Sequence, residues 1–151
     1  IRLYLDSQRW PEARQATADF LKIYPNEVRY VHYAASVLLN ARRFDDMVAL
    51  LEPLAQRRTD YQIYTLLGFA QAMTGRKAEG VALLNRAIRL DPDNYWAYYS
   101  LGYAHVFTGD PRAAVPYFEK VLQIRPDYPE IEDQLRTIRE SAANPSPSQR
   151  Q

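Results

Sequence analysis

Four aromatic residues, Trp96, Tyr99, Tyr103 and Phe107, are the part of this sequence best suited to binding chemistry. Their spacing of three or four residues would place them on one face of a helix, and each ring can bury about 150 to 250 Å². We call these four residues the aromatic stripe. Half exposed, they would form a patch of roughly a few hundred Å², the size that usually marks an interaction site. Alternatively, the C-terminal helix or a neighbouring helix folds over these rings and makes them core.

Catalytic chemistry has no comparable signal in the sequence. The chain has no cysteine, and its two histidines, His32 and His105, lie far apart in the sequence. A glycine-rich phosphate loop, a zinc-type histidine pair and a nucleophile beside a base are all missing. The sequence therefore predicts no enzyme, no catalytic residue, no metal site and no cofactor.

The overall charge does not indicate a basic surface that would bind nucleic acid or an anionic membrane. The 151 residues carry 19 basic and 18 acidic side chains, for a net charge of +1. No apolar run approaches the roughly 20 residues that would cross a bilayer, so we expect this stretch to be soluble. Because it opens on Ile1 within a repeat pattern, we expect a fragment of a longer protein, in the cytoplasm or the periplasm.

The elements that must position the aromatic stripe follow from a repeat. A motif of two tyrosines followed by Leu-Gly occurs twice with an offset of 34 residues. It reads Tyr61-x-x-Tyr64-x-x-Leu67-Gly68 and then Tyr95-x-x-Tyr98-x-x-Leu101-Gly102. A fixed period of this length indicates stacked supersecondary units that share a continuous core.

These residues resemble the tetratricopeptide repeat (TPR) family, whose signature spans two helices and closes on a proline. Pro92 and Pro126 occupy that closing position, while Gln71, Gly80 and His105 depart from the signature. The resemblance implies an all-α fold, a right-handed α-solenoid of helix-turn-helix repeats. We expect about three and a half repeats followed by a C-terminal capping helix.

The same register divides the whole chain into units. Helical periodicity runs from Ile63 to Met73 and from Lys77 to Leu90, separated by Thr74-Gly75. Pro53 and Pro116 lie inside second helices, where each should produce a kink. The predicted units are the second half of a truncated repeat at 1–27, a divergent repeat at 28–60, repeats at 61–94 and 95–128, the capping helix at 129–143 and a disordered tail at 144–151.

The resemblance also implies where a ligand would bind, because the first helix of each TPR unit lines the concave groove. Positions 2, 5, 9 and 13 of each unit face that groove in the family. The candidate ligand-binding residues are therefore Arg29, His32, Ser36 and Asn40, then Gln62, Thr65, Phe69 and Met73, then Trp96, Tyr99, Tyr103 and Phe107.

The resulting functional prediction is a non-enzymatic scaffold that binds a protein or peptide segment with apolar anchors and so assembles a multiprotein complex. The Lys and Asn clamp by which some TPR proteins grip chaperone tails is replaced here, for instance by His32 and Ser36. Two alternatives stay open. One is self-association into a homo-oligomer through the unfinished N-terminal unit. The other is glycan contact through the aromatic row, as part of a bacterial secretion or exopolysaccharide export machine.

Overall fold

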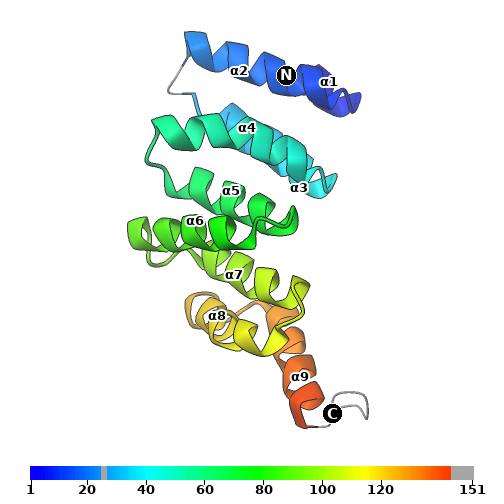
Figure 1. The fold of residues 1–151 in the computed structure, drawn as a ribbon, viewed down its shortest axis with the longest axis vertical. Coiled ribbons are helices and arrows are strands. Elements are labelled where there is room, and N and C mark those ends of the chain that lie inside the picture. The colour runs from blue at the N-terminus through cyan, green and yellow to red at the C-terminus, as the bar shows by residue number, and fades with distance from the viewer. Residues whose placement is uncertain (25–26, 144–151) are drawn as a thin grey trace.

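The computed structural model describes residues 1–24 and 27–143, and within these ranges it contains nine α-helices and no strand (Figure 1). The prediction of an all-α fold is confirmed. The helices are α1 (Arg2–Asp6), α2 (Trp10–Ile23), α3 (Arg29–Asn40), α4 (Phe44–Arg57), α5 (Tyr61–Met73), α6 (Lys77–Leu90), α7 (Tyr95–Phe107), α8 (Pro111–Ile124) and α9 (Pro129–Ala143).

The helices stack one after another along the long axis of the molecule, so α1 and α9 lie at opposite ends of the stack (Figure 1). Consecutive helices pack as hairpins, with α5 against α6 and α7 against α8. Each hairpin also packs on the next, since α5 and α6 both contact α7. This is the nearest-neighbour packing of a solenoid.

Local signals in the sequence explain where these helices begin and end. The Asp60 carboxylate accepts hydrogen bonds from the backbone N–H groups of Gln62 and Ile63, and so caps the start of α5. Helices α5 and α7 are each followed by a glycine with positive φ, 87° at Gly75 and 84° at Gly109. Asp110 caps α8, whose first residue is Pro111.

Two prolines lie within helices, as the sequence predicted. Pro53 is inside α4 and Pro116 is inside α8, and both side chains are exposed to solvent. Both helices continue past the proline. A proline removes the hydrogen bond to the carbonyl oxygen four residues earlier. At an exposed position water can bind that oxygen instead, which explains why these helices tolerate the proline.

The C-terminal helix α9 covers the end of the stack. Ile131, Leu135 and Ile138 are buried along one stripe and join Phe118 and Val121 of α8 in one apolar cluster. The opposite face of α9 is polar, so α9 has the two faces that a capping helix needs. The predicted tail at 144–151 lies outside the described residues.

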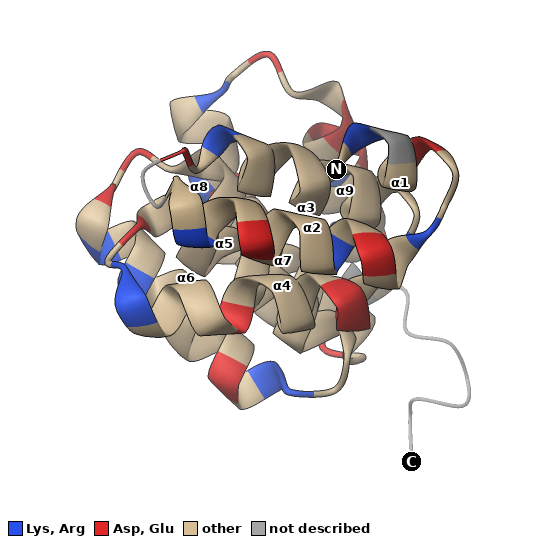
Figure 2. Cartoon of the chain, turned by 90° about the horizontal axis from the view of Figure 1, so that it is seen from above, with Lys and Arg blue, Asp and Glu red and all other residues tan. Residues whose placement is uncertain are grey.

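Charged residues of both signs are interspersed when the stack is viewed from above (Figure 2). Several ion pairs join neighbouring turns of one helix at exposed positions, such as Lys22 with Asp19 at 2.8 Å and Arg136 with Asp133 at 2.5 Å. Such exposed pairs contribute little to stability. The fold therefore depends on apolar packing between helices.

Candidate functional site

A continuous row of aromatic rings joins helices α5 and α7. Trp96 stacks on Tyr99 with ring centroids 4.9 Å apart and 9° between the planes, and Tyr99 stacks on Tyr103 at 5.9 Å and 17°. Phe69 of α5 contacts both ends of this row, at 6.1 Å from Trp96 and 5.9 Å from Tyr103. Three members of the aromatic stripe and Phe69 thus form one cluster.

The exposure of these rings differs along the row. Phe69 is only 6% exposed and also contacts Phe44 of α4 at 5.9 Å, so it belongs to the core. Trp96, Tyr99 and Tyr103 are half-buried, and Phe107 is 60% exposed. The stripe is therefore neither fully open nor fully covered.

Part of the cover comes from the segment just before α9. Tyr128 lies 6.2 Å from Tyr99, and Phe118 of α8 lies 6.4 Å from it. Burial raises the pKa of the Tyr99 phenol to about 12, and the nearby Glu130, Tyr128 and Tyr103 act in the same direction. Tyr99 therefore stays protonated at neutral pH and can donate a hydrogen bond.

A groove of about 430 Å³ lies beside this row, between the first helices α3 and α5 and the start of α7. Four of the candidate residues line it: His32, Gln62, Thr65 and Trp96. The Thr65 hydroxyl donates to the Tyr61 carbonyl oxygen at 2.7 Å and accepts from the Asn94 amide at 2.9 Å. The His32 Nε2 atom is buried and has no hydrogen-bond partner among the described residues.

The remaining candidate residues do not line this groove, and Trp96 is the one member of the aromatic stripe that does. Arg29 is exposed, pairs with Glu27 at 2.9 Å and lines a different groove near the N-terminus. Ser36 and Asn40 are exposed farther along α3, and the Ser36 hydroxyl donates to the His32 carbonyl oxygen. Met73 is half-buried at the end of α5.

Sequence reasoning missed the loop that closes one side of the groove. Asp91, Asp93 and Asn94, between α6 and α7, line it together with Tyr61 and Tyr95. Asn94 precedes a helix and caps it by accepting from the Ala97 N–H, a role that its position could have suggested. Its second bond, to Thr65 of the preceding repeat, depends on how the repeats stack and has no sequence signal.

The arrangement is suited to binding. Half-buried rings offer apolar contact area, while Asp91, Asp93 and the Gln62 amide offer polar groups at the rim. Among the described residues no group of three or more His, Cys, Asp or Glu side chains could hold a metal ion. None of the described helices has the length and apolar character to cross a membrane.

Comparison with known proteins gives matches to two repeat-family models. One, described as TPR repeat, matches residues 78–109, and another, described as tetratricopeptide repeat, matches residues 97–128. A search among curated proteins gives no significant match.

Solved structures of MamA resemble the whole stack. One crystal structure of MamA has a TM-score of 0.73 and 23% identity, covering 93% of this chain and 82% of that one. MamA 41-end from Desulfovibrio magneticus RS-1 gives a TM-score of 0.59 and 24% identity over 80% of this chain and 69% of that one. A structure of MamA MSR-1 gives a TM-score of 0.63 and 19% identity, covering 93% of this chain and 81% of that one.

At these identities the likeness establishes the fold alone. Both family matches include Leu101-Gly102, whereas Leu67-Gly68 precedes them. The helical stack extends the same architecture through the rest of the described chain. The matches thus identify tetratricopeptide repeats within residues 78–128, and the described chain has the all-helical solenoid fold seen in MamA.

Proposed function

We propose that this chain is a non-enzymatic scaffold whose first-helix groove binds a protein segment with apolar anchors. TPR repeats fit a protein-interaction scaffold, and the groove beside Trp96 is the surface of this chain that best suits that role. The groove supplies half-exposed aromatic rings and a polar rim from the loop between α6 and α7.

The observation that carries the proposal is the stacked row of Trp96, Tyr99 and Tyr103. Large aromatic side chains dominate binding energy at protein interfaces. Here the rings are held rigid by mutual stacking and by the buried Phe69, so they lose little conformational freedom when a partner binds. An apolar side chain of a partner would pack against these rings.

The test uses Trp96 as a reporter. The chain has two tryptophans, so Trp96 is the one tryptophan that remains in the Trp10→Phe variant and gives its tryptophan fluorescence. Peptides from a random 12-residue phage-displayed library are selected on this variant and titrated as synthetic peptides. We expect a saturable change in Trp96 emission, because a bound side chain replaces water beside the indole.

The matched control is a second reporter, Trp96→Phe, in which only Trp10 fluoresces. Its emission should stay constant through the same titration, since Trp10 packs in the N-terminal apolar cluster. Peptides that bind with no response from Trp96 would occupy another surface, and the proposal would then be wrong.

Self-association is a second candidate, and the N-terminal end of the stack favours it. A groove of about 920 Å³ there is lined mainly by apolar side chains, including Phe20, Ile23, Tyr30 and Tyr33. Ile23 is 71% exposed and Tyr33 is 41% exposed. A second copy could bury these residues.

Light scattering coupled to size exclusion distinguishes this candidate. If two copies meet at the N-terminal groove, a concentration-dependent dimer should disappear in Ile23→Asp and persist in Trp96→Ala. A chain that is monomeric at every concentration would exclude self-association and leave the groove beside Trp96 for an external partner.

A further inference from the structure

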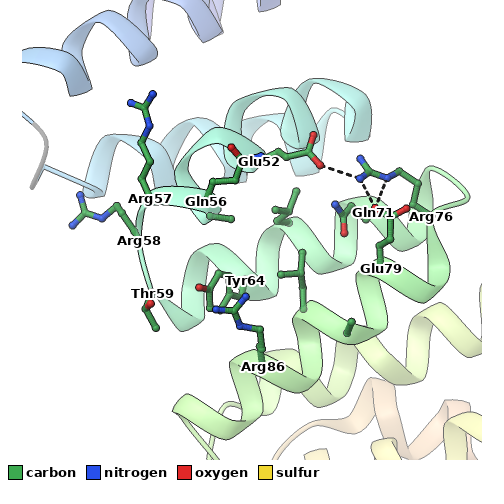
Figure 3. A pocket seen from close by; sticks show the side chains of 14 residues that line it. Glu52, Gln56, Arg57, Arg58, Thr59, Tyr64, Gln71, Arg76, Glu79 and Arg86 are labelled. Atoms are coloured by element: carbon green, nitrogen blue, oxygen red, sulfur yellow. Dashed lines mark hydrogen bonds and ion pairs between the residues drawn. The ribbon is translucent and has the colours of Figure 1, made fainter.

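A second groove, of about 570 Å³, lies on the opposite side of α5, between the second helices α4 and α6 (Figure 3). Its floor is apolar and includes Ala55, Leu67 and Leu83. We call it the α4–α6 groove. None of the candidate residues from the sequence lines it, so the scaffold function proposed above does not use it.

The groove exists because this repeat lacks two rings that the next repeat has. Gln71 and Leu83 correspond, 34 residues later, to His105 and Tyr117. The His105 and Tyr117 rings stack with centroids 5.5 Å apart and 14° between planes. The smaller pair in the repeat at 61–94 leaves the equivalent space open.

Positive charge is concentrated at one end of the α4–α6 groove. Arg57 is the last residue of α4 and Arg58 follows it. The Arg86 guanidinium lies over the Tyr64 ring, 4.5 Å from its centroid (Figure 3). Neither Arg57 nor Arg86 takes part in an ion pair within the described part of the chain. The Arg57–Arg58–Thr59 segment also lines the neighbouring groove between α2 and α4, where Arg14 adds a further cation.

The other end carries a net negative charge. Arg76 binds Glu52 at 2.9 Å and also Glu79, and these two carboxylates are the acidic side chains that line the groove (Figure 3). The groove therefore has a cationic end and an acidic end. A uniform polyanion such as RNA would meet Glu52 and Glu79 unfavourably.

Gln71 lines the groove near the acidic end, and its side-chain oxygen accepts no hydrogen bond from the described residues. Its side chain is 3% exposed, and its Oε1 atom is buried with no hydrogen-bond partner among the described residues. Buried acceptors are normally satisfied. Gln71 therefore supplies the groove with a side-chain amide whose oxygen no described residue satisfies.

We propose that the α4–α6 groove is a second docking site, which binds an extended acidic segment of a partner protein. A carboxylate of the segment binds the Arg86 guanidinium, since guanidinium groups bind carboxylates well, and Arg57 and Arg58 add positive charge at that end of the groove. An aliphatic side chain packs on Leu67 and Leu83, and a main-chain group forms a hydrogen bond with the Gln71 amide.

The dimensions fit a short motif. Tyr64 and Gln71 are seven residues apart on α5, a distance of about 10 Å along the helix axis. An extended chain covers about 10 Å with three residues. The motif therefore has an acidic residue and an aliphatic residue within about three positions of each other.

The experiment selects 12-residue peptides from a phage-displayed library on the full chain and counter-selects on the double variant Gln71→His with Leu83→Tyr. This variant fills the groove with the ring pair of the next repeat. We expect the surviving peptides to carry Asp or Glu beside an aliphatic residue, and to bind the double variant at least about tenfold more weakly than the parent.

Charge reversal tests the cationic end and keeps the proposal falsifiable if the double variant does not fold. Arg86→Glu should weaken the selected peptides at least about tenfold, and changing the peptide's acidic residue to Lys should restore most of that loss. The matched control is Arg89→Glu, an exposed position of α6 outside the groove, which should leave the affinity within about threefold.

Three results would overturn the proposal. The first is a selection with no acidic enrichment or no binders. The second is equal affinity for the parent chain and a folded double variant. The third is binding of an eight-nucleotide RNA that shows the same loss with Arg86→Glu, because the groove would then recognise a polyanion.

Discussion

Phe69 is the residue at which three helices meet. Its ring contacts Phe44 of α4 and both Trp96 and Tyr103 of α7, and it is 6% exposed. Phe69 therefore belongs to the core and packs against the buried side of the Trp96 and Tyr103 rings. A ligand would touch the rings of α7, while Phe69 would hold them in place.

The first prediction concerns this supporting role. Phe69→Ala removes a buried ring and leaves a cavity, so the free energy of unfolding should fall by about 3 to 5 kcal/mol in urea denaturation. Phe107→Ala is the matched control, since Phe107 is 60% exposed, and it should change the stability by about 0.5 kcal/mol or less. Equal effects at the two positions would show that Phe69 is not core.

His105 makes stability depend on pH. Its ring is half-buried against Tyr117, and burial lowers its pKa below the ordinary 6.5, with Lys77 acting in the same direction. A histidine with a depressed pKa in the folded state binds its proton more readily when unfolded. Its stabilising effect is present above pH 6.5 and is lost as the pH falls through the folded-state pKa.

The second prediction follows from this sign. The free energy of unfolding should decrease between about pH 7 and pH 5, and His105→Gln should show a smaller decrease over that range. Equilibrium urea unfolding at several pH values measures both. Glu12, Asp19 and Glu79 have lowered pKa values, so their contributions are lost only at more acidic pH. Parallel pH profiles for the two proteins would contradict the assignment to His105.

At the scale of elements, α5 and α6 pack so closely that their backbones are in contact at Gly68 and Gly80. A Cβ atom on Gly80 would lie 2.4 Å from the Gly68 carbonyl oxygen and 2.9 Å from the Ala72 nitrogen. The family signature has alanine at the Gly80 position, and the next repeat has Ala114 there. This hairpin is therefore closer than the sequence pattern indicates.

The third prediction is that Gly80→Ala destabilises the chain. Alanine gains about 1 kcal/mol over glycine in helix propensity, but the backbone of α5 cannot move aside as a flexible side chain would. Separation of the helices should cost about 1 to 3 kcal/mol and outweigh that gain. Thermal and urea unfolding would detect the change, with Ala114→Gly as the reverse substitution at the equivalent position. A more stable Gly80→Ala protein would refute the close crossing.

Many of the helix boundaries could be predicted because the signals that set them lie within a few residues of each boundary. Gly75 and Gly109 follow helix ends, and Asp110-Pro111 begins a helix, through interactions within a few residues. The predicted helix from Lys77 to Leu90 coincides with α6. The α4–α6 groove could not be predicted in this way. Gln71 departs visibly from the signature, but whether a smaller residue leaves space depends on how α4 packs over α5.

The candidate site was partly predictable for the same reason. The spacing of Trp96, Tyr99 and Tyr103 on one helix predicts their shared face, and these rings do stack. The burial of Phe69 and the cover from Tyr128 arise between elements distant in sequence. Periodicity within a unit carries no information on such contacts.

At the scale of the whole molecule, the solenoid separates surfaces that a compact domain would merge. The first helices α3, α5 and α7 form the groove beside Trp96, while the second helices α4 and α6 form the cationic groove on the other side of α5. The N-terminal groove and the capping helix α9 lie at opposite ends of the stack (Figure 1). One chain could thus contact several partners at once, as a scaffold requires.

The fourth prediction tests the central claim, that the aromatic row binds a protein segment. The peptide is one that changes Trp96 emission when it binds. Isothermal titration calorimetry would measure the affinity of this peptide for the parent chain, for Trp96→Ala and for Tyr103→Ala. Each substitution should weaken binding by about 2 kcal/mol or more, because interface aromatics of this kind are typical hot spots. Tyr24→Ala, an exposed aromatic near the N-terminal end, is the control and should leave the affinity unchanged. A loss below about 0.5 kcal/mol at both Trp96 and Tyr103 would contradict the claim.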